Sequence, residues 1–555
     1  PPFARLPQGL ARLLLVGGRG PGLVAARDAA LAAGAQWGYL ADALALAVWE
    51  DAPLCVGAAA ILAGRHGRRP FLPPAIVRAV ATVAEVPGAT DLGAYYNRLA
   101  ARRDIAKMLA YLLERQRKTP GDCGVLARLA AIAPMAGGEE GPARVEAVFA
   151  TLPGALAPLG ALVAGELALL HGRFEGAEAH FRSVLTEAPL ASARLGLAQA
   201  LRRQGGRDAA IAELATACRS RPFDSLALSR LHDVATGLAD RRTPLPGSVA
   251  VLVYSYNNAA LLDRTLAALA ATEWRLAAGP GGGHLFVLDN GSADATGVVL
   301  TGWRERLGER LSVISLPVNV GAPAARNWLA AMPEVRAMDF TAYLDDDASV
   351  PPDWLGRFGA AVEALPEAGA WGCLIRGQGA PRYVQSGDTH LFPLPRSDDG
   401  FGRAFEPARP WLATPDCEQY AVCRPCASVT GCCHLFRTEV LAALGGFDIR
   451  FSPSQYDDLD HDLRLLLAGR VPVFQGHLAV THAKATGAAG NPGGASYGSG
   501  FANQFKLHHK YDDAAIARAT DTAFAALADD VARKVAVLAD LGLIDAQGTA
   551  EGGHG

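Results

Sequence analysis

The sequence is poor in cysteine, carries little net charge and lacks long apolar runs. Nine cysteines among 555 residues do not make a disulfide framework, which favours a reducing, cytoplasmic setting. No apolar run approaches the roughly 18–20 residues that a transmembrane helix needs. The formal net charge of -3 provides no basic field for nucleic acid or an anionic membrane. The composition therefore argues against a disulfide scaffold, a membrane-spanning protein and a nucleic-acid-binding protein.

What is present is a globular composition, with 50% hydrophobic and 19% charged residues. The length predicts about three or four domains. Residues 1–150 are predicted to be helical, because segments such as GYLADALALAVWEDA place apolar residues three and four positions apart. LLLVGGRGPG near the start does not match G-x-G-x-x-G, so we expect a helix–loop–helix there and no dinucleotide-binding loop.

Residues 151–243 contain an internal repeat. GELALLHGRFEGAEAHFRSVLTEAP is followed, at an offset of 33 residues, by LAQALRRQGGRDAAIAELATACRSRP. Small Ala177 matches Ala210 and large Phe181 matches Leu214. A small residue permits close helix packing and a large one fills the groove. The unit resembles the tetratricopeptide repeat, a helix pair of about 34 residues; an irregular helical bundle is the alternative.

A linker at 241–248 separates this region from an alternating strand and helix pattern over residues 244–490. Short β-rich runs, SVAVLVYSY, HLFVLDN, LSVISLP and DFTAYLDDD, are separated by helical stretches. This alternation predicts a mostly parallel sheet with helices on both faces. Polar residues stand at or just after the end of each of the four runs, at 256–258, 289–292, 319–321 and 345–347. Because ligands bind beyond the carboxyl ends of parallel strands, the polar residues predict one binding site there.

Six motifs in this part, in order, resemble those of family 2 glycosyltransferases of the GT-A fold. They are VYSYNNAALLDRTLAAL, VLDNGSADAT, NVGAPAARNWL, YLDDDASVPPDWL, GCCHLFRTEVLAALGGFD and YDDLDHDLRLLLAGR. The resemblance covers residues 248 to about 484, under half of the chain. It implies an enzyme that moves a sugar from a nucleotide-diphosphate sugar, with a UDP-sugar favoured, to a hydroxyl acceptor.

The resemblance implies a donor pocket at the strand ends. Asp289 suits a hydrogen bond to the base or ribose, although an Asx turn closing the strand would also explain it. Tyr256 could stack on the base, and Arg326 either supports the phosphates or pairs with a carboxylate. The residues assigned to the donor nucleotide are Ser255, Tyr256, Asn257, Asp289, Asn290, Arg326, Asp345 and Asp346.

Three consecutive aspartates, residues 345–347, repel one another unless a cation lies between them. Carboxylate oxygens suit Mg²⁺ or Mn²⁺, and a solvated acidic turn is the alternative. The family pattern implies that Asp345 meets the ribose side of the donor and that Asp347 holds the ion beside the diphosphate, where Asp346 could assist. Asp345 is assigned to the metal site as well. Related enzymes often add a histidine, for which His482 is assigned and His477 competes.

The catalytic base is assigned to the acidic stretch YDDLDHDL. An inverting transfer needs a base that takes the proton of the acceptor hydroxyl. Asp458 matches the family's aspartate, and Asp457 is the second candidate. Asp460 and Arg464 are one helical turn apart and are expected to form an i,i+4 ion pair.

The clustered cysteines and the C-terminal part, residues 491–555, leave alternatives open. Cys423 and Cys426 form half of a zinc-site spacing, with Cys417 and Cys433 nearby, but packing in a buried strand is favoured. The glycine-rich stretch from 484 to 500 is either a linker or a lid over the donor. The amphipathic tail packs on the catalytic domain or mediates dimers.

The sequence as a whole predicts a soluble, metal-dependent, inverting glycosyltransferase with an α-helical, repeat-like N-terminal region and C-terminal helices. The acceptor is a protein recruited by the helical repeats, a glycan or a lipid-linked molecule. The alternative is a catalytically degenerate GT-A domain that acts as a repeat-based protein-binding scaffold. A nucleotidyltransferase ranks last, because no glycine- and arginine-rich phosphate loop follows the first strand.

Overall fold

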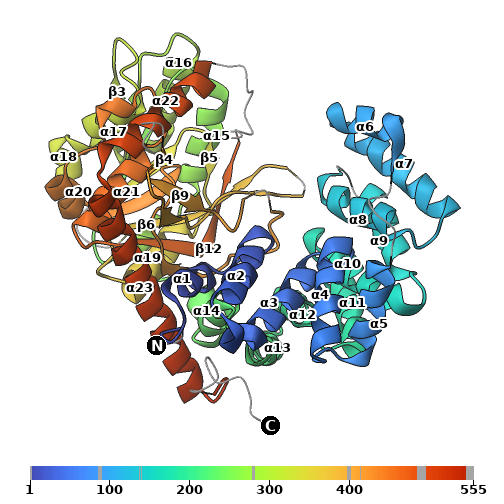
Figure 1. Cartoon of the computed structure of the whole chain (residues 1–555). Helices are drawn as coiled ribbons and strands as arrows, with labels where there is room; N and C mark the ends of the chain where they lie inside the picture. The colour runs from blue at the N-terminus through green and yellow to red at the C-terminus, as the bar shows by residue number, and fades with distance from the viewer. Residues whose placement is uncertain are drawn as a thin grey trace.

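The computed structural model has an all-helical N-terminal region, an α/β domain and two C-terminal helices (Figure 1). It describes residues 3–85, 91–136, 138, 140–277, 282–379, 381–396, 402–412, 414–483 and 495–545. Within these ranges, every helix is too short or too polar to cross a bilayer.

The N-terminal region contains fourteen α-helices among the described residues, as its apolar periodicity predicts. They are α1 (Gln8–Val16), α2 (Pro21–Ala32), α3 (Gly38–Asp51), α4 (Val56–Arg68), α5 (Pro74–Ala84), α6 (Gly93–Ala101), α7 (Ile105–Lys118), α8 (Cys123–Ile132), α9 (Glu140–Ala150), α10 (Ala157–Leu170), α11 (Phe174–Glu187), α12 (Ala191–Arg203), α13 (Arg207–Ser220) and α14 (Ser225–Ala235). Several begin at an aspartate cap; Asp224, for example, accepts a hydrogen bond from the Ala227 amide. The predicted helix–loop–helix near the start is present as α1 and α2.

The repeated segments form two successive helix pairs, α10–α11 and α12–α13. Phe181 is fully buried, and its ring lies between two glycines of neighbouring helices. A Cβ atom on Gly165 would be 2.7 Å from the ring, and one on Gly196 would be 2.4 Å away. Ala177 and Ala210 are both fully buried at the small position. The pattern of small and large residues therefore sets the spacing of these helices.

The α/β domain is built on a mixed, mostly parallel sheet, with a separate hairpin of β8 and β9. The strand order is β10-β12-β6-β11-β4-β1-β2-β3, with β5 pairing β12 and β7 pairing β6. The strands are β1 (Val249–Ser255), β2 (Gly283–Asp289), β3 (Leu311–Ser315), β4 (Phe340–Asp345), β5 (Ala348–Ser349), β6 (Ala370–Gly377), β7 (Val384–Ser386), β8 (His390–Pro393), β9 (Phe405–Ala408), β10 (Cys423–Pro425), β11 (Cys433–Arg437) and β12 (Pro472–His482). Strands β1 to β4 are parallel, and β11 runs antiparallel to β4 and β6.

Helices cover both faces of the sheet, so its strands are hydrophobic on both sides. The helices are α15 (Ala259–Ala270), α16 (Thr296–Leu307), α17 (Ala322–Ala330), α18 (Pro333–Arg336), α19 (Trp354–Ala364), α20 (Thr438–Leu444) and α21 (Asp457–Leu467). Val251 of β1 packs in one core with Leu266 of α15. Its neighbour Leu252 faces the other way and packs in a second core with Leu329 of α17. The fold is thus the predicted GT-A architecture.

The parallel register brings the polar strand ends together. Tyr254 of β1 pairs with Asp345 of β4, and Ser255 pairs with Asp289 of β2. The amide of Asn290 donates to the carbonyl of Ser255 at 2.8 Å. The aspartates that end two different strands therefore flank the same residues of β1.

Two buried charged residues join the helical region to the α/β domain. Asp233 of α14 accepts a hydrogen bond from the Cys423 amide at 2.7 Å and lies 2.9 Å from His477 Nε2. Arg424 of β10 is fully buried and donates to the Val16 carbonyl at the end of α1, at 2.9 Å. Because a buried charge is costly without partners, these contacts fix the two parts together.

The C-terminal helices, α22 (Ala495–Lys510) and α23 (Asp513–Asp540), lie against the rest of the molecule. Helix α23 packs on α1 and α14 of the helical region and on β8, β10 and α21 of the α/β domain (Figure 1). Its buried Lys534 lies 3.8 Å from Asp233 and 3.0 Å from Asp530. The tail thus packs on the catalytic domain, as one of the two predictions had it, and on the helical region as well.

Candidate active site

The aspartate triplet lies where β4 ends, and the end of β12 lies beside it. Strand β5 follows the triplet directly and pairs antiparallel with β12, so that Ala348 faces His482. His482 Nε2 is 2.9 Å from Asp347 Oδ1, and the Ala483 amide donates to the Asp347 carbonyl at 2.9 Å. Gln385 of β7 holds the other ring nitrogen of His482 at 2.9 Å. Four elements therefore fix one imidazole beside the carboxylates.

A cluster of potential metal ligands is formed by Asp345, Cys432 and His482. One ligand atom from each lies within 4.8 Å of the others, and Asp347 is joined to the cluster through His482. Carboxylate ligands suit Mn²⁺ or Mg²⁺, whereas imidazole is a ligand of transition metals and favours Mn²⁺ of the two. Burial and the nearby carboxylates raise the pKa of the Cys432 thiol, which keeps it neutral and a poor ligand for a hard cation. The residues present therefore fit the predicted ion, with the aspartates and His482 as its ligands.

Burial also acts on Asp345 itself. It raises the pKa of this carboxyl to about 6, and Asp347 and Asp346 add to the rise, although Arg326 and His482 oppose it. The cause is the loss of water around a charge that has too few counter-charges. This is the electrostatic situation that a bound cation would relieve.

A single buried arginine joins the aspartate triplet to the acidic helix. Arg326 of α17 is 5% exposed. Its Nη1 donates to Asp457 Oδ2 at 2.5 Å, and its Nη2 lies 3.5 Å from Asp345 Oδ1. The rings of Tyr254 and Phe447 lie 5.4 and 5.2 Å from the guanidinium carbon. Of its two predicted roles, pairing with carboxylates is the one that the structure shows.

Helix α21 begins at the acidic stretch, directly after Tyr456, whose φ is 71°. Asp458 is half-buried and accepts a hydrogen bond from the Gly431 amide at 2.8 Å. Asp457 is buried, and burial raises its pKa although Arg326 opposes the rise. Asp460 pairs with Arg464 at 3.3 Å, as expected, and also with Lys510 of α22 at 2.5 Å. Asp458 is therefore the more accessible of the two candidate bases.

Ser255 and Asn257 hold the loops of the predicted donor pocket together. The Ser255 hydroxyl donates to Asp346 Oδ2 at 2.5 Å. The Asn257 side chain accepts from the Ala293 amide at 2.7 Å, and Ser292 accepts from the Asn257 amide at 2.9 Å. Asn257 has a φ of 48°, which asparagine tolerates better than most residues. Tyr256, between them, is 46% exposed, as a residue that stacks on a base would be.

Asp289 and Asn290 make structural contacts at the end of β2. One oxygen of Asp289 accepts from the Ser292 amide at 2.9 Å, which is the Asx turn raised as the alternative. Asn290 is 2% exposed and bonds to Asn319 at 3.0 Å and to the Val320 amide at 3.0 Å. Asn290 thus links two loops and has little surface left to contact a nucleotide-sugar donor. The second carboxylate oxygen of Asp289 is not used in the Asx turn.

Several contacts at the site were not expected from the sequence. Gln385 belongs to none of the six motifs, whereas Tyr254 and Cys432 lie within two of them but have no assigned role. The pairing of the strands brings all three to the site. Asp462 is buried and accepts from the Ser428 hydroxyl at 2.7 Å and from the Val429 amide at 2.9 Å. These bonds pin α21 to the segment before β11, a role that its place in the acidic stretch could have suggested.

The competing histidine and the cysteines lie elsewhere. His477 contacts Asp233 at the junction with the helical region and does not approach the aspartate triplet. Cys423, Cys426 and Cys433 are buried in the α/β domain, and no group of metal ligands among the described residues includes Cys417, Cys423 or Cys426. Residues 484–494 of the glycine-rich stretch lie outside the described residues.

The strand order, the acidic end of β4 and the helices on both faces define a GT-A domain. Residues 250–445 match the family model described as glycosyl transferase family 2. The chain therefore contains a family 2 glycosyltransferase domain, flanked by helical parts that the match does not cover. No curated protein matches the sequence.

Several solved structures resemble the chain in part. GalNAc-T7 with UDP, GalNAc and Mn²⁺ has 15% sequence identity and a TM-score of 0.38, covering 49% of this chain and 50% of that one. The mannosyltransferase PcManGT from Pyrobaculum calidifontis, with GDP-Man and Mn²⁺, has 18% identity and a TM-score of 0.32, covering 61% and 96%. S. aureus TarS 1-349 has 17% identity and a TM-score of 0.30, covering 42% and 60%. The chain thus spans half the length of the first of these structures.

Proposed function

We propose that the chain is a metal-dependent, inverting glycosyltransferase that moves a sugar from a nucleotide-diphosphate sugar, with a UDP-sugar favoured, to a hydroxyl acceptor. The observation that carries the proposal is Arg326, which contacts Asp345 at the end of β4 and Asp457 at the start of α21. The proximity of the end of β4 to the start of α21, which carries Asp457 and Asp458, supports a metal ion and a base that act on the same donor, as a single displacement requires.

In the proposed reaction, the acceptor oxygen attacks the anomeric carbon from the side opposite the diphosphate. Its proton passes to Asp458, the C–O bond to the diphosphate breaks, and the nucleoside diphosphate leaves with the bonding electron pair. Arg326 keeps the base helix in place, and Asp289 and Tyr256 orient the nucleotide. Asp345, Asp347 and His482 would hold a divalent cation, which stabilises negative charge on the departing diphosphate when bound.

The first experiment is a thermal-shift screen of UDP- and GDP-sugars with Mn²⁺, Mg²⁺ or EDTA, followed by a donor hydrolysis assay on the sugars that bind. We expect at least one UDP-sugar to raise the melting temperature only with the metal. Asp347→Ala is expected to weaken metal-dependent donor binding by about 100-fold or more. No donor binding with either metal, or hydrolysis that EDTA leaves unchanged, would contradict the proposal.

A further inference from the structure

A cavity of about 1480 Å³ lies between the helical region and the α/β domain. Helices α4, α8, α10 and α12 and the loop between α1 and α2 form one side. Residues from 406–412, which include most of β9, and from 414–419 form the other side. This volume exceeds the roughly 300–1,000 Å³ of a small-molecule site. The space therefore suits a chain-like occupant better than a single sugar or nucleotide.

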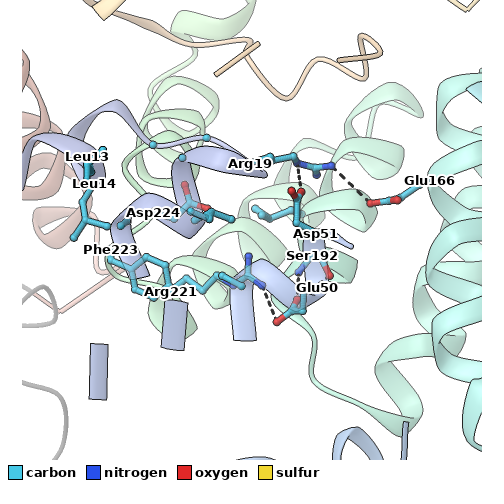
Figure 2. A pocket seen from close by; sticks show the side chains of 17 residues that line it. Leu13, Leu14, Arg19, Glu50, Asp51, Glu166, Ser192, Arg221, Phe223 and Asp224 are labelled. Atoms are coloured by element: carbon cyan, nitrogen blue, oxygen red, sulfur yellow. Dashed lines mark hydrogen bonds and ion pairs between the residues drawn. The ribbon is translucent and has the colours of Figure 1, made fainter. Parts of the chain in front are cut away.

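The wall of the cavity combines small residues with three arginines and three carboxylates, which are Arg19, Arg128, Arg409, Asp51, Glu166 and Glu406. Six glycines line it: Gly17, Gly20, Gly22, Gly57, Gly124 and Gly196. Arg19 lies between Asp51, at 3.6 Å, and Glu166, at 3.8 Å (Figure 2). The two distances exceed those of normal hydrogen bonds. Side-chain exposures of 45% for Arg19 and 41% for Glu166 leave both a donor and an acceptor open to an occupant.

The presence of both positive and negative side chains on the wall favours some classes of occupant over others. A hydrocarbon chain would cover the charges without replacing their hydrogen bonds to water, which is costly. An anionic headgroup would meet as many carboxylates as arginines on this wall. A peptide backbone offers an N–H and a C=O at every residue, so it can satisfy Glu166 and Arg19 together, while the mixed charged and apolar remainder of the wall takes its side chains.

The cavity wall is connected to the candidate active site. Thr414 lines the cavity, and its carbonyl accepts from the Val384 amide of β7 at 3.0 Å. The next residue, Gln385, holds His482. Arg409 also lines the cavity, and its positive charge opposes the rise in the pKa of Tyr456 that burial causes, which places it near the start of α21. An occupant on this wall is thus one strand away from the metal ligands.

We infer that the cavity binds an extended polypeptide segment that carries the acceptor hydroxyl, an inference that rests on the proposed function. A serine or threonine hydroxyl of that segment would then be the attacking oxygen, losing its proton to Asp458 as the diphosphate leaves.

Gly57→Trp tests the cavity directly. Gly57 lies in the first turn of α4, and a Cβ there meets nothing within 4 Å among the described residues. The indole would take up part of the cavity at this wall without straining the backbone. Gly64→Trp is the matched control, because Gly64 lies on the same helix in equally open space but does not line the cavity. Glu166→Gln removes the acceptor charge with almost no change in shape.

A phage-displayed library of random dodecapeptides is panned on the wild-type chain, and the selected sequences are synthesised and measured by fluorescence anisotropy. We expect peptides that bind the wild type and Gly64→Trp equally, bind Gly57→Trp at least tenfold more weakly and bind Glu166→Gln several-fold more weakly. Thermal shift with the donor and Mn²⁺ should be the same for all four proteins.

Three results would overturn the inference. They are the absence of enriched peptides, peptides that bind Gly57→Trp as well as the wild type, and a cavity filled instead by a fluorescent fatty acid or maltooligosaccharide probe that Gly57→Trp displaces. Donor binding is read separately. If peptides show the expected affinities for the four proteins but none of the proteins binds a donor, the cavity is a peptide-binding site and the proposed transferase function is refuted.

Discussion

In the α/β domain, carboxylates from two elements gather around one buried arginine, whereas in the helical region the ring of Phe181 packs between two glycines. Arg326 reaches Asp345 and Asp457 through charge. Phe181 contacts Gly165 and Gly196 by van der Waals packing alone. A change in the first region should therefore affect chemistry more than folding, and a change in the second should affect folding more than chemistry.

The largest expected effect is on the chemistry of the α/β domain. Asp458→Asn is expected to lower sugar transfer about 10²–10⁴-fold, because the amide cannot take the acceptor proton. Donor affinity, measured by thermal shift with Mn²⁺, should stay near the wild-type value. Near-normal turnover would move the base to another residue, and Asp457→Asn would then be the variant to measure.

The junction between the two regions should show a large effect on folding. Asp233→Ala leaves Lys534, His477 and the Cys423 amide without their shared carboxylate. Removing one partner of a buried ion pair costs about 3–5 kcal/mol, which urea unfolding would measure. Asp240→Ala is the control, because Asp240 pairs with Arg202 on the surface with 66% of its side chain exposed. If both variants lost the same free energy of unfolding, the buried contacts of Asp233 would not stabilise the junction.

A smaller loss of stability is expected inside the helical region. Gly196→Ala places a Cβ 2.4 Å from the Phe181 ring, which Gly165 blocks from the other side. Overpacking of this kind costs about 1–3 kcal/mol, which should exceed the gain in helix propensity. Gly176→Ala on α11 meets no described atom within 4 Å and should stabilise the chain by about 0.5–1 kcal/mol. Urea unfolding that showed the same sign for both variants would contradict the tight packing.

The last expected effect, which depends on pH, tests the conflict between function and stability at Asp345. Because its pKa is raised to about 6, the folded chain binds this proton more tightly than the unfolded chain. The carboxyl therefore costs no stability at low pH, and it costs the most above pH 6. Without metal, Asp345→Asn should be more stable than the wild type at pH 7.5 by on the order of 1–3 kcal/mol.

This advantage should shrink as the pH falls toward 4, and urea unfolding in EDTA at several pH values would show it. Asp339→Asn is the control of opposite sign, because hydrogen bonds from Ser248 lower the pKa of Asp339. That variant should lose stability at pH 7.5. A stability difference for Asp345→Asn that does not change with pH would refute the assigned cause.

The two regions also differ in what the sequence could predict. The strand ends carried recognisable polar motifs, so the sheet, the acidic helix and the grouping of Asp345 with His482 could be predicted. The contacts of Gln385 and Cys432 could not, because they depend on how β7, β11 and β12 pair. Asn290 was assigned to the donor because it shares a motif with Asp289, but its buried amide joins two loops.

In the helical region, the repeat predicted the helix pairs but not what they enclose. Arg19, Asp51 and Glu166 come from three separate segments, and none belongs to a motif that carries chemistry. The sequence does not predict that Arg424 and Asp233 are buried, because they become buried only where the helical region packs on the α/β domain. Sequence patterns report local periodicity, and a cavity between two parts is not a local property.

Helix α23 has a consequence for how the protein is made. It packs on α1 near the start of the chain and on β8 and β10 within the α/β domain, and Lys534 completes the charge balance around Asp233. The junction therefore cannot close during synthesis until α23 has left the ribosome, even though domains generally fold as they emerge. Nascent chains that stop before residue 513 would lack the positive charge of Lys534 beside Asp233 and would expose the apolar flank of α14, which makes them candidates for chaperone binding.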